Sequence, residues 1–138
     1  MAETAPNIAT TTVCYIVVKA REFEAQEDVV EPDYASDAVD DGFRQVLEAY
    51  ADDPTFDELR TFIDDLNVDD QCQLVALAWV GRGDYSKGDW DEALSLARER
   101  HNERTSLYLL GMPLLPDYLE EGLAAFDLSC EDFEMGHL

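Results

Sequence analysis

The stretch NVDDQCQLVALAWVGRGDYSKGDW, residues 67–90, decides the fold of this chain. Its apolar run of seven residues, positions 74–80, is compatible with a buried strand or with a buried helix. A helix is favoured because Asn67 can cap its start, two aspartates follow in the first turn, and the run contains two alanines. A helix over residues 68–80 is apolar almost all round, so we expect it to be the central and most buried helix.

The residues after this helix predict a tight turn and a second helix. Gly81 is expected to end the central helix in the left-handed conformation. Asp89, with Glu92 three residues later, has the pattern of a capping box and opens a helix that we expect to run to Leu110. Pro116 then begins a further helix, and Ser129 can cap a last turn.

Further helices are predicted on the N-terminal side. Apolar residues recur at helical spacing over residues 10–26. A weaker pattern indicates a short helix from Asp40 or Asp41 to about residue 50. Asp53 followed by Pro54 is a strong start signal, because proline fits the first helical position. That helix is expected to run to about residue 66.

No segment shows the alternation that indicates a strand, and no internal repeat is visible. The sequence therefore predicts the all-α class, as a compact single-domain bundle of about six helices around the central apolar helix. The domain is expected to cover residues 10–134. A flexible N-terminal tail (1–9) precedes it, and a C-terminal tail (135–138) follows it.

Charge is the strongest compositional signal, because the chain of 138 residues has a formal net charge of −23. Residues 22–70 hold eighteen acidic and two basic residues, whereas residues 71–138 hold thirteen acidic and five basic ones. Such a surface repels nucleic acid and anionic membranes, so direct binding of either is not expected. The acids could bind a basic partner, imitate the charge of DNA, or belong to a salt-rich cytoplasm. The simplest interpretation is a solvated, soluble surface.

A cytoplasmic location is expected from two absences in the sequence. No apolar run reaches the roughly eighteen residues of a membrane span. The N-terminal residues MAETAPNIATTT show no basic region followed by an apolar one. The three cysteines are far apart and lack CxxC spacing, so buried free thiols are expected rather than disulfides or zinc ligands. They are Cys14, Cys72 and Cys130.

The loop after the central helix combines three glycines, two basic residues and two aspartates between two tryptophans. Phosphate binding is disfavoured, because the loop leaves a helix C-terminus and has no GxxxxGK[ST] pattern. Arg82 can complement the helix dipole and pair with a neighbouring acid, or it can contact a partner. Asp84 fits an Asx turn. Trp79 and Trp90 are core aromatics in the simplest interpretation, and interaction hot spots if they are half exposed.

No catalytic, cofactor or metal site is predicted. His101 is expected on the apolar stripe of the helix over residues 90–110, as a hydrogen-bonded, partly buried histidine or as a general base. No nucleophile or second metal ligand accompanies it, and HExxH is absent. Glu120 and Glu121 are adjacent, so on a helix they point about 100° apart and do not form a ready acid–base pair.

Three strings resemble an uncharacterised domain-of-unknown-function family (number 3775) of small proteobacterial proteins: LVALAWVGRGD, HNERTSLYLLGMPLLPDYLEEGL and SCEDFE. The resemblance covers residues 13–134, and its markers are W-x-GRGD and YLLG-x-PLL-x-DYLEEGL. It implies a bacterial, soluble, single-domain protein, and it brings no activity, cofactor or catalytic residue. The distinctive positions are Trp79, Gly81, Arg82, Gly83, Asp84, His101, Asn102, Arg104, Tyr118, Glu120, Glu121 and Gly122.

Five of the nine basic residues lie between Arg82 and Arg104, which makes this the least acidic part of the chain. The leading hypothesis is a non-enzymatic protein-binding or regulatory module that uses the 81–90 loop and adjoining helices to bind a protein partner or a second copy of itself. Two alternatives stay open. One is a small-ligand or enzymatic site around His101, Arg82 and Arg104, and the other is a DNA mimic or decoy for a basic protein built from the acids of residues 22–70. The candidate binding residues are Trp79, Arg82, Asp84, Trp90, His101, Arg104, Glu120 and Glu121.

Overall fold

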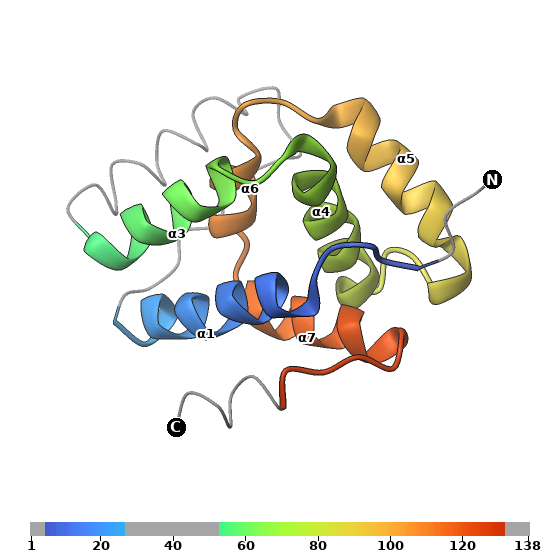
Figure 1. Cartoon of the computed structure of the whole chain (residues 1–138). Coiled ribbons are helices and arrows are strands. Elements are labelled where there is room, and N and C mark those ends of the chain that lie inside the picture. Colours follow the sequence, from blue (N-terminus) through green and yellow to red (C-terminus); the bar gives the residue numbers. More distant parts are fainter. Residues whose placement is uncertain (1–4, 27–52, 132–138) are drawn as a thin grey trace.

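The computed structural model describes residues 5–26 and 53–131, and within these ranges the chain forms six α-helices, one 3₁₀ turn and no β-strand. Figure 1 shows the helices gathered into one bundle with α4 at its centre. The predicted all-α bundle is therefore confirmed, while the short helix expected before residue 50 lies outside the described residues. The elements are α1 (Thr10–Gln26), α3 (Pro54–Asp64), α4 (Val68–Arg82), η1 (Lys87–Asp89), α5 (Trp90–Arg100), α6 (Thr105–Leu110) and α7 (Leu115–Ala125).

α4 is buried along most of its length and on every face. All ten residues from Gln71 to Val80 are buried. Asn67 caps the helix as predicted, since its Oδ1 accepts from the backbone N–H of Asp70 at 2.7 Å. A helix without a polar face must be covered on all sides, and α5, α6 and α7 all pack against α4 (Figure 1).

The start of α3 also follows the prediction. Pro54 occupies the first helical position, and the Asp53 carboxylate accepts from the backbone N–H groups of Thr55 at 2.8 Å and Phe56 at 3.2 Å. The segment before α1 is attached to α4, because the side-chain carbonyl of Gln73 accepts from the backbone N–H of Ile8 at 2.8 Å. The boundaries expected for the two terminal tails stay predictions.

The expected left-handed end of α4 at Gly81 is wrong. The helix continues to Arg82, and the left-handed residue is Gly83, with φ of 96°. Gly81 instead lies against α7, where a Cβ atom would come within 1.7 Å of the Tyr118 carbonyl oxygen. Gly122 of α7 faces α4 in the same way, since a Cβ there would lie 2.5 Å from the Leu77 carbonyl oxygen. The two glycines thus allow the backbones of α4 and α7 to touch.

The single helix expected over residues 90–110 is also wrong, because it is divided into α5 and α6. His101 has an extended backbone with ψ of 137° and ends α5. Asn102 stabilises the break: its side-chain oxygen accepts from the backbone N–H of Arg104 at 2.7 Å, and its backbone carbonyl accepts from the Thr105 hydroxyl at 2.9 Å. The capping box is absent as well, since the Asp89 carboxylate accepts from the Ser86 hydroxyl at 2.9 Å rather than from a helix N–H.

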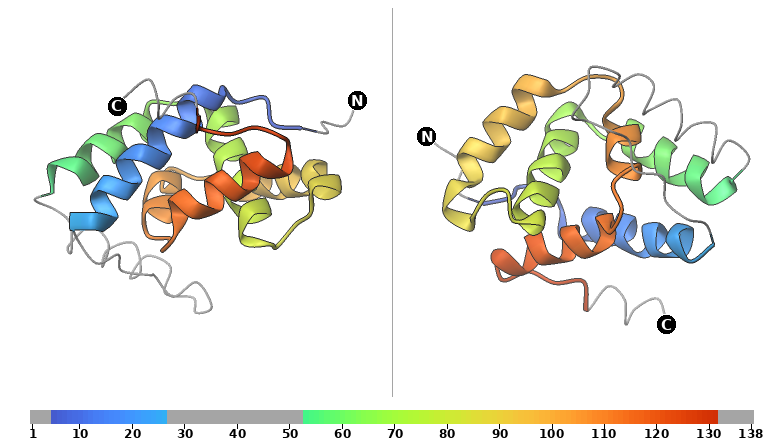
Figure 2. Two further views of the ribbon diagram at one scale, coloured as in Figure 1. Left: turned by 90° about the horizontal axis from the view of Figure 1, so that it is seen from below. Right: turned by 180° about the vertical axis from the view of Figure 1, so that it is seen from behind.

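The prediction of three free thiols is right for Cys72 and wrong for the other two cysteines. Cys14 of α1 and Cys130, just beyond α7, form a disulfide with their Cα atoms 5.4 Å apart. Figures 1 and 2 show α1 and α7 side by side, and their packing brings together two cysteines that are 116 residues apart in sequence. Cys72 is free and buried in α4.

Candidate functional site

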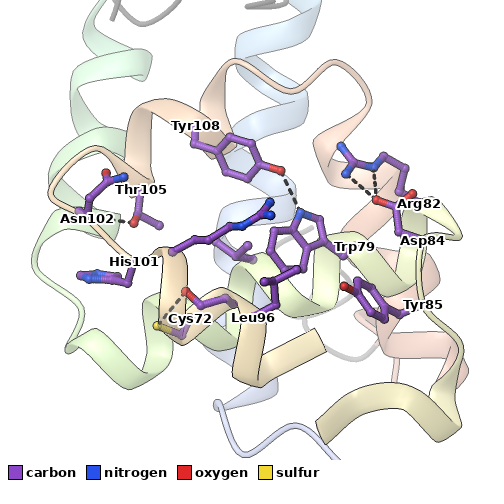
Figure 3. Close-up of a pocket in the computed structure, with 13 residues that line it drawn as sticks. Cys72, Trp79, Arg82, Asp84, Tyr85, Leu96, His101, Asn102, Thr105 and Tyr108 are labelled. Atoms are coloured by element: carbon purple, nitrogen blue, oxygen red, sulfur yellow. Dashed lines mark hydrogen bonds and ion pairs between the residues drawn. The ribbon is translucent and has the colours of Figure 1, made fainter. Parts of the chain in front are cut away.

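A pocket with a volume of about 660 Å³ opens on the side of α4 that faces α5 and α6. α4, α5 and α6 each form part of its wall, together with the loop after α4 and the break between α5 and α6 (Figure 3). The break is what makes the pocket possible, because an uninterrupted helix could not turn around the end of α4. The lining residues are Cys72, Val75, Trp79, Arg82, Asp84, Tyr85, Leu96, Ala97, Arg100, His101, Asn102, Thr105 and Tyr108.

Four of the eight candidate binding residues line this pocket, namely Trp79, Arg82, Asp84 and His101. The other four lie elsewhere in the structure. Trp90 is fully buried and packs edge-on against Phe126, with ring centroids 5.4 Å apart. Arg104 is half-buried just before α6.

The two adjacent glutamates of α7 lie on a different face of the bundle from the pocket. Glu120 forms an ion pair with Arg21 of α1, which also contacts Asp117 at 3.3 Å. Glu121 is exposed. The pocket therefore brings four of the eight candidates together, two lie on α7, and Trp90 and Arg104 belong to neither group.

Aromatic side chains form one wall of the pocket, which we call the aromatic wall: Trp79, Tyr85 and Tyr108. The Trp79 indole N–H donates to the Tyr108 hydroxyl oxygen at 2.8 Å. The Trp79 and Tyr85 rings are inclined by 29° with their centroids 6.0 Å apart, which is a stacked arrangement. Since the indole N–H is already bonded, Trp79 presents only its apolar ring to a ligand.

Arg82 carries a charge that its own loop neutralises. Its guanidinium donates to the Asp84 carboxylate, from Nε at 2.8 Å and also from Nη2. Burial alone would lower the pKa of Arg82. Asp84 and the neighbouring Tyr108 hydroxyl raise this pKa by more than burial lowers it, so the net direction is upward. The guanidinium is therefore always charged, and the pair adds no net charge to the pocket.

Arg100 differs from Arg82 in having no carboxylate partner. It lines the pocket, and it makes no ion pair or side-chain hydrogen bond with any residue in the described ranges. Its place in the last turn of α5 suits the helix dipole. Its guanidinium therefore donates to no side chain within residues 5–26 and 53–131, in a chain that has 32 acidic and nine basic residues.

His101 is held by a neighbouring side chain in one orientation. The Gln71 amide nitrogen donates to the backbone carbonyl oxygens of Ile63 at 2.9 Å and Leu66 at 3.3 Å. Because a carbonyl can only accept, the Gln71 oxygen must face His101, whose Nε2 lies 2.6 Å away and donates to it. Figure 3 shows the ring turned away from Trp79. The contact joins the break to the α3–α4 turn, which agrees with the interpretation of His101 as a hydrogen-bonded structural histidine.

Cys72 lies in the same pocket without the features of a reactive thiol. Its side chain is 1% exposed, and burial raises the pKa of the thiol. A raised pKa reduces the thiolate population, and the thiolate is the nucleophile. Among the described residues no group of three histidine, cysteine or acidic side chains could hold a metal ion. The lining thus combines aromatic, apolar and cationic groups that can make binding contacts.

Sequence reasoning missed three residues that line the pocket: Tyr85, Arg100 and Tyr108. Tyr108 falls within the single helix expected over residues 90–110, and the break in that helix brings it beside Trp79. Arg100 gave no signal, because a cation in the last turn of a helix has an ordinary explanation. The only sequence signal for the aromatic wall was the position of Tyr85 between the two tryptophans that flank the loop.

Comparison with known proteins gives a family and little more. The family model DUF3775, described as a protein of unknown function, matches residues 56–128. That range runs from α3 to just beyond α7 and contains every residue that lines the pocket, whereas both cysteines of the disulfide lie outside it. No curated protein and no solved structure matches the chain.

Proposed function

The chain belongs to the DUF3775 family, whose function is unknown, and we propose from the pocket itself that the protein is a binding module for a small organic ligand. The observation that supports this proposal is the convergence of an aromatic wall, an arginine without an ion pair to any described residue, and apolar side chains on one cavity of about 660 Å³. Pockets that hold small molecules are about 300–1,000 Å³ in volume, mostly apolar, and carry a few polar groups. This pocket has those properties.

The two tryptophans provide a direct test. Trp79 lines the pocket and Trp90 is buried away from it, so the variants Trp90→Phe and Trp79→Phe each leave one reporter. A library of small organic compounds is screened by thermal shift. A true ligand should raise the melting temperature and change the emission of the Trp90→Phe protein, but not that of the Trp79→Phe protein.

A pair of substitutions on α5 makes the test specific for the pocket. Leu96 lines the cavity, whereas its neighbour Ser95 is exposed. Leu96→Trp should abolish the thermal shift by filling the cavity, and Ser95→Trp should leave it intact. The proposal fails if no compound shifts the wild-type protein, or if the shift survives Leu96→Trp.

Binding of a protein partner or a second copy through the 81–90 loop remains a second proposal. Its support is exposure, since most residues of that loop are exposed, Arg82, Lys87 and Gly88 among them. Trp90 does not belong to such a surface, because it is fully buried. Pull-downs and light scattering with Lys87→Glu test this proposal, and unchanged partners and unchanged oligomeric state would contradict it.

The remaining hypotheses from the sequence stay as proposals. Many of the acids in residues 22–70 fall outside the described ranges, so the DNA-mimic hypothesis rests on charge alone. No helix within the described ranges is long and apolar enough to cross a bilayer. A bacterial, cytoplasmic protein is still our proposal. The Cys14–Cys130 disulfide counts against that location, because such bonds persist mainly in oxidising compartments, and it therefore provides a test. Thiol trapping in intact host cells should show Cys14 and Cys130 reduced if the proposal holds.

A further inference from the structure

We infer that the ligand of this pocket is a planar aromatic anion, an aromatic carboxylate or a similar acid, with its charged group at Arg100 and its ring against the aromatic wall. The inference rests on the proposed function and names the chemical class of the ligand. It combines three properties of the lining: its charge, its aromatic character and its apolar remainder.

The charge of the lining favours an anion. Arg82 and Asp84 neutralise each other, so Arg100 is left as the uncompensated charge among the lining residues. An arginine presents its N–H groups as a planar fork that matches a carboxylate, and charge-assisted hydrogen bonds are the stronger kind. A cationic ligand would find no uncompensated carboxylate among the described lining residues, because the charge of Asp84 is paired with Arg82 through its Oδ2 atom.

The net charge of the whole chain sharpens this assignment. With a net charge of −23, the protein repels anions at long range, and most described basic residues are matched by an acid. Repulsion between exposed charges is screened over about 10 Å at an ionic strength of 0.1 M. An anion bound at Arg100 is therefore held by direct contact with this side chain. Removal of the Arg100 charge alone should abolish the preference of the pocket for an anion.

The shape and composition of the lining favour a flat ring. Trp79, Tyr85 and Tyr108 contribute ring faces and edges, and aromatic pairs gain stabilisation in stacked or edge-on arrangements. Val75, Leu96 and Ala97 add apolar contacts without polar groups that would need partners. A bulky aliphatic acid could reach Arg100 but would lose the aromatic contacts.

The test uses three probes that separate charge from planarity: 1-naphthylacetate, its neutral amide, and cyclohexylacetate. We expect calorimetric titration to show 1-naphthylacetate binding at least tenfold more tightly than either of the others. Arg100→Gln should bring the acid and the amide within about twofold of each other. Lys87→Gln is the matched control, because Lys87 is also an exposed cation without an ion pair to a described residue, and it does not line the pocket.

Two results would overturn the inference. Equal affinity of the acid and the amide for the wild-type protein would remove the role of charge, and a preference that survives Arg100→Gln would remove the role of Arg100. Absence of binding by all three probes also overturns it. In each case the library screen tests the proposed function separately. A neutral or aliphatic compound that binds the wild-type protein but not the Leu96→Trp variant would still establish a ligand pocket.

Discussion

The two sides of α4 are built in opposite ways. On the α7 side, Gly81 and Gly122 bring two backbones into contact, and the Cys14–Cys130 bond fastens α1 to the segment after α7. On the α5–α6 side, a break in the helical chain leaves a cavity of about 660 Å³ with an arginine that pairs with no acid in the described part of the chain. The contrast teaches that tight packing and the proposed binding pocket are separated across one helix, so substitutions on the two sides should have effects of different size and kind.

Loss of the disulfide should have the largest effect on stability. Cross-linking residues 116 positions apart restricts the unfolded chain, and the chain-entropy model assigns about 4–5 kcal/mol to a loop of that size. Reduction, or Cys14→Ser with Cys130→Ser, should lower the free energy of unfolding by up to that amount in urea titrations. A thiol assay in denaturant should find one reactive thiol per chain before reduction and three after it, and three before reduction would contradict the bond.

Gly81→Ala should have the next largest effect. A Cβ atom at this position would meet the Tyr118 carbonyl oxygen, a backbone atom that cannot move without shifting α7. Such overpacking should cost about 3 kcal/mol or more, measured by urea denaturation. Gly88→Ala is the control, since the nearest atom to a Cβ there is the Ser86 hydroxyl oxygen at 3.9 Å. Similar effects from the two substitutions would refute close packing on this side.

On the pocket side, Tyr108→Phe should have a smaller effect. It removes the acceptor for the Trp79 indole N–H in a largely buried position, and a lost hydrogen bond of this kind costs about 1 kcal/mol. Thermal unfolding compared with Tyr118→Phe provides the check, because the Tyr118 hydroxyl has no hydrogen bond to a described residue. A cost near that of Gly81→Ala would mean that the pocket side is not the looser one.

The smallest effect expected is a dependence on pH at the edge of the pocket side. Arg98, which donates to Asp69 at 2.7 Å, holds the pKa of Asp69 below its usual 3.8, with help from Gln73. A lowered pKa stabilises the fold fully above about pH 4, and the contribution is lost as the pH falls through the folded value. Because the pair is exposed, Asp69→Asn should cost well under 1 kcal/mol at pH 7.

That substitution should also flatten the loss of stability below pH 4. Glu103→Gln is the control for the general benefit of removing one negative charge from this acidic chain, since Glu103 is exposed in the break between α5 and α6. An equal change of the pH profile in both variants would assign the effect to net charge rather than to the Asp69–Arg98 pair.

The parts of the fold that were predictable are those set by local interactions. Asp53 and Asn67 cap helices through bonds to residues two or three positions away, so their sequence neighbourhood is sufficient to identify them. The central position of α4 followed from its apolar residues on every face. The role of Gly81 was not predictable, because the reason for that glycine is a backbone atom of Tyr118, 37 positions further along the chain.

The same distinction explains what was missed at the site. The helix formers around residue 100 favour one long helix, and the Asn102 contacts that interrupt it are individually weak signals. Without the break, Tyr108 and Arg100 cannot be placed beside Trp79, so the pocket could not be foreseen. The prediction that Cys14 and Cys130 are free thiols failed for a related reason. Their separation in sequence gives no information about the contact of α1 with α7.

The Cys14–Cys130 bond makes most of this chain a covalent ring. A single cut of the backbone anywhere between these two residues yields pieces that remain one molecule until the sulfurs are reduced. The described pocket residues all lie inside the ring, so a protein cut once within it keeps every one of them in the same covalent molecule. After a single cut, separation of the two pieces therefore requires a second and chemically different event, reduction of the disulfide.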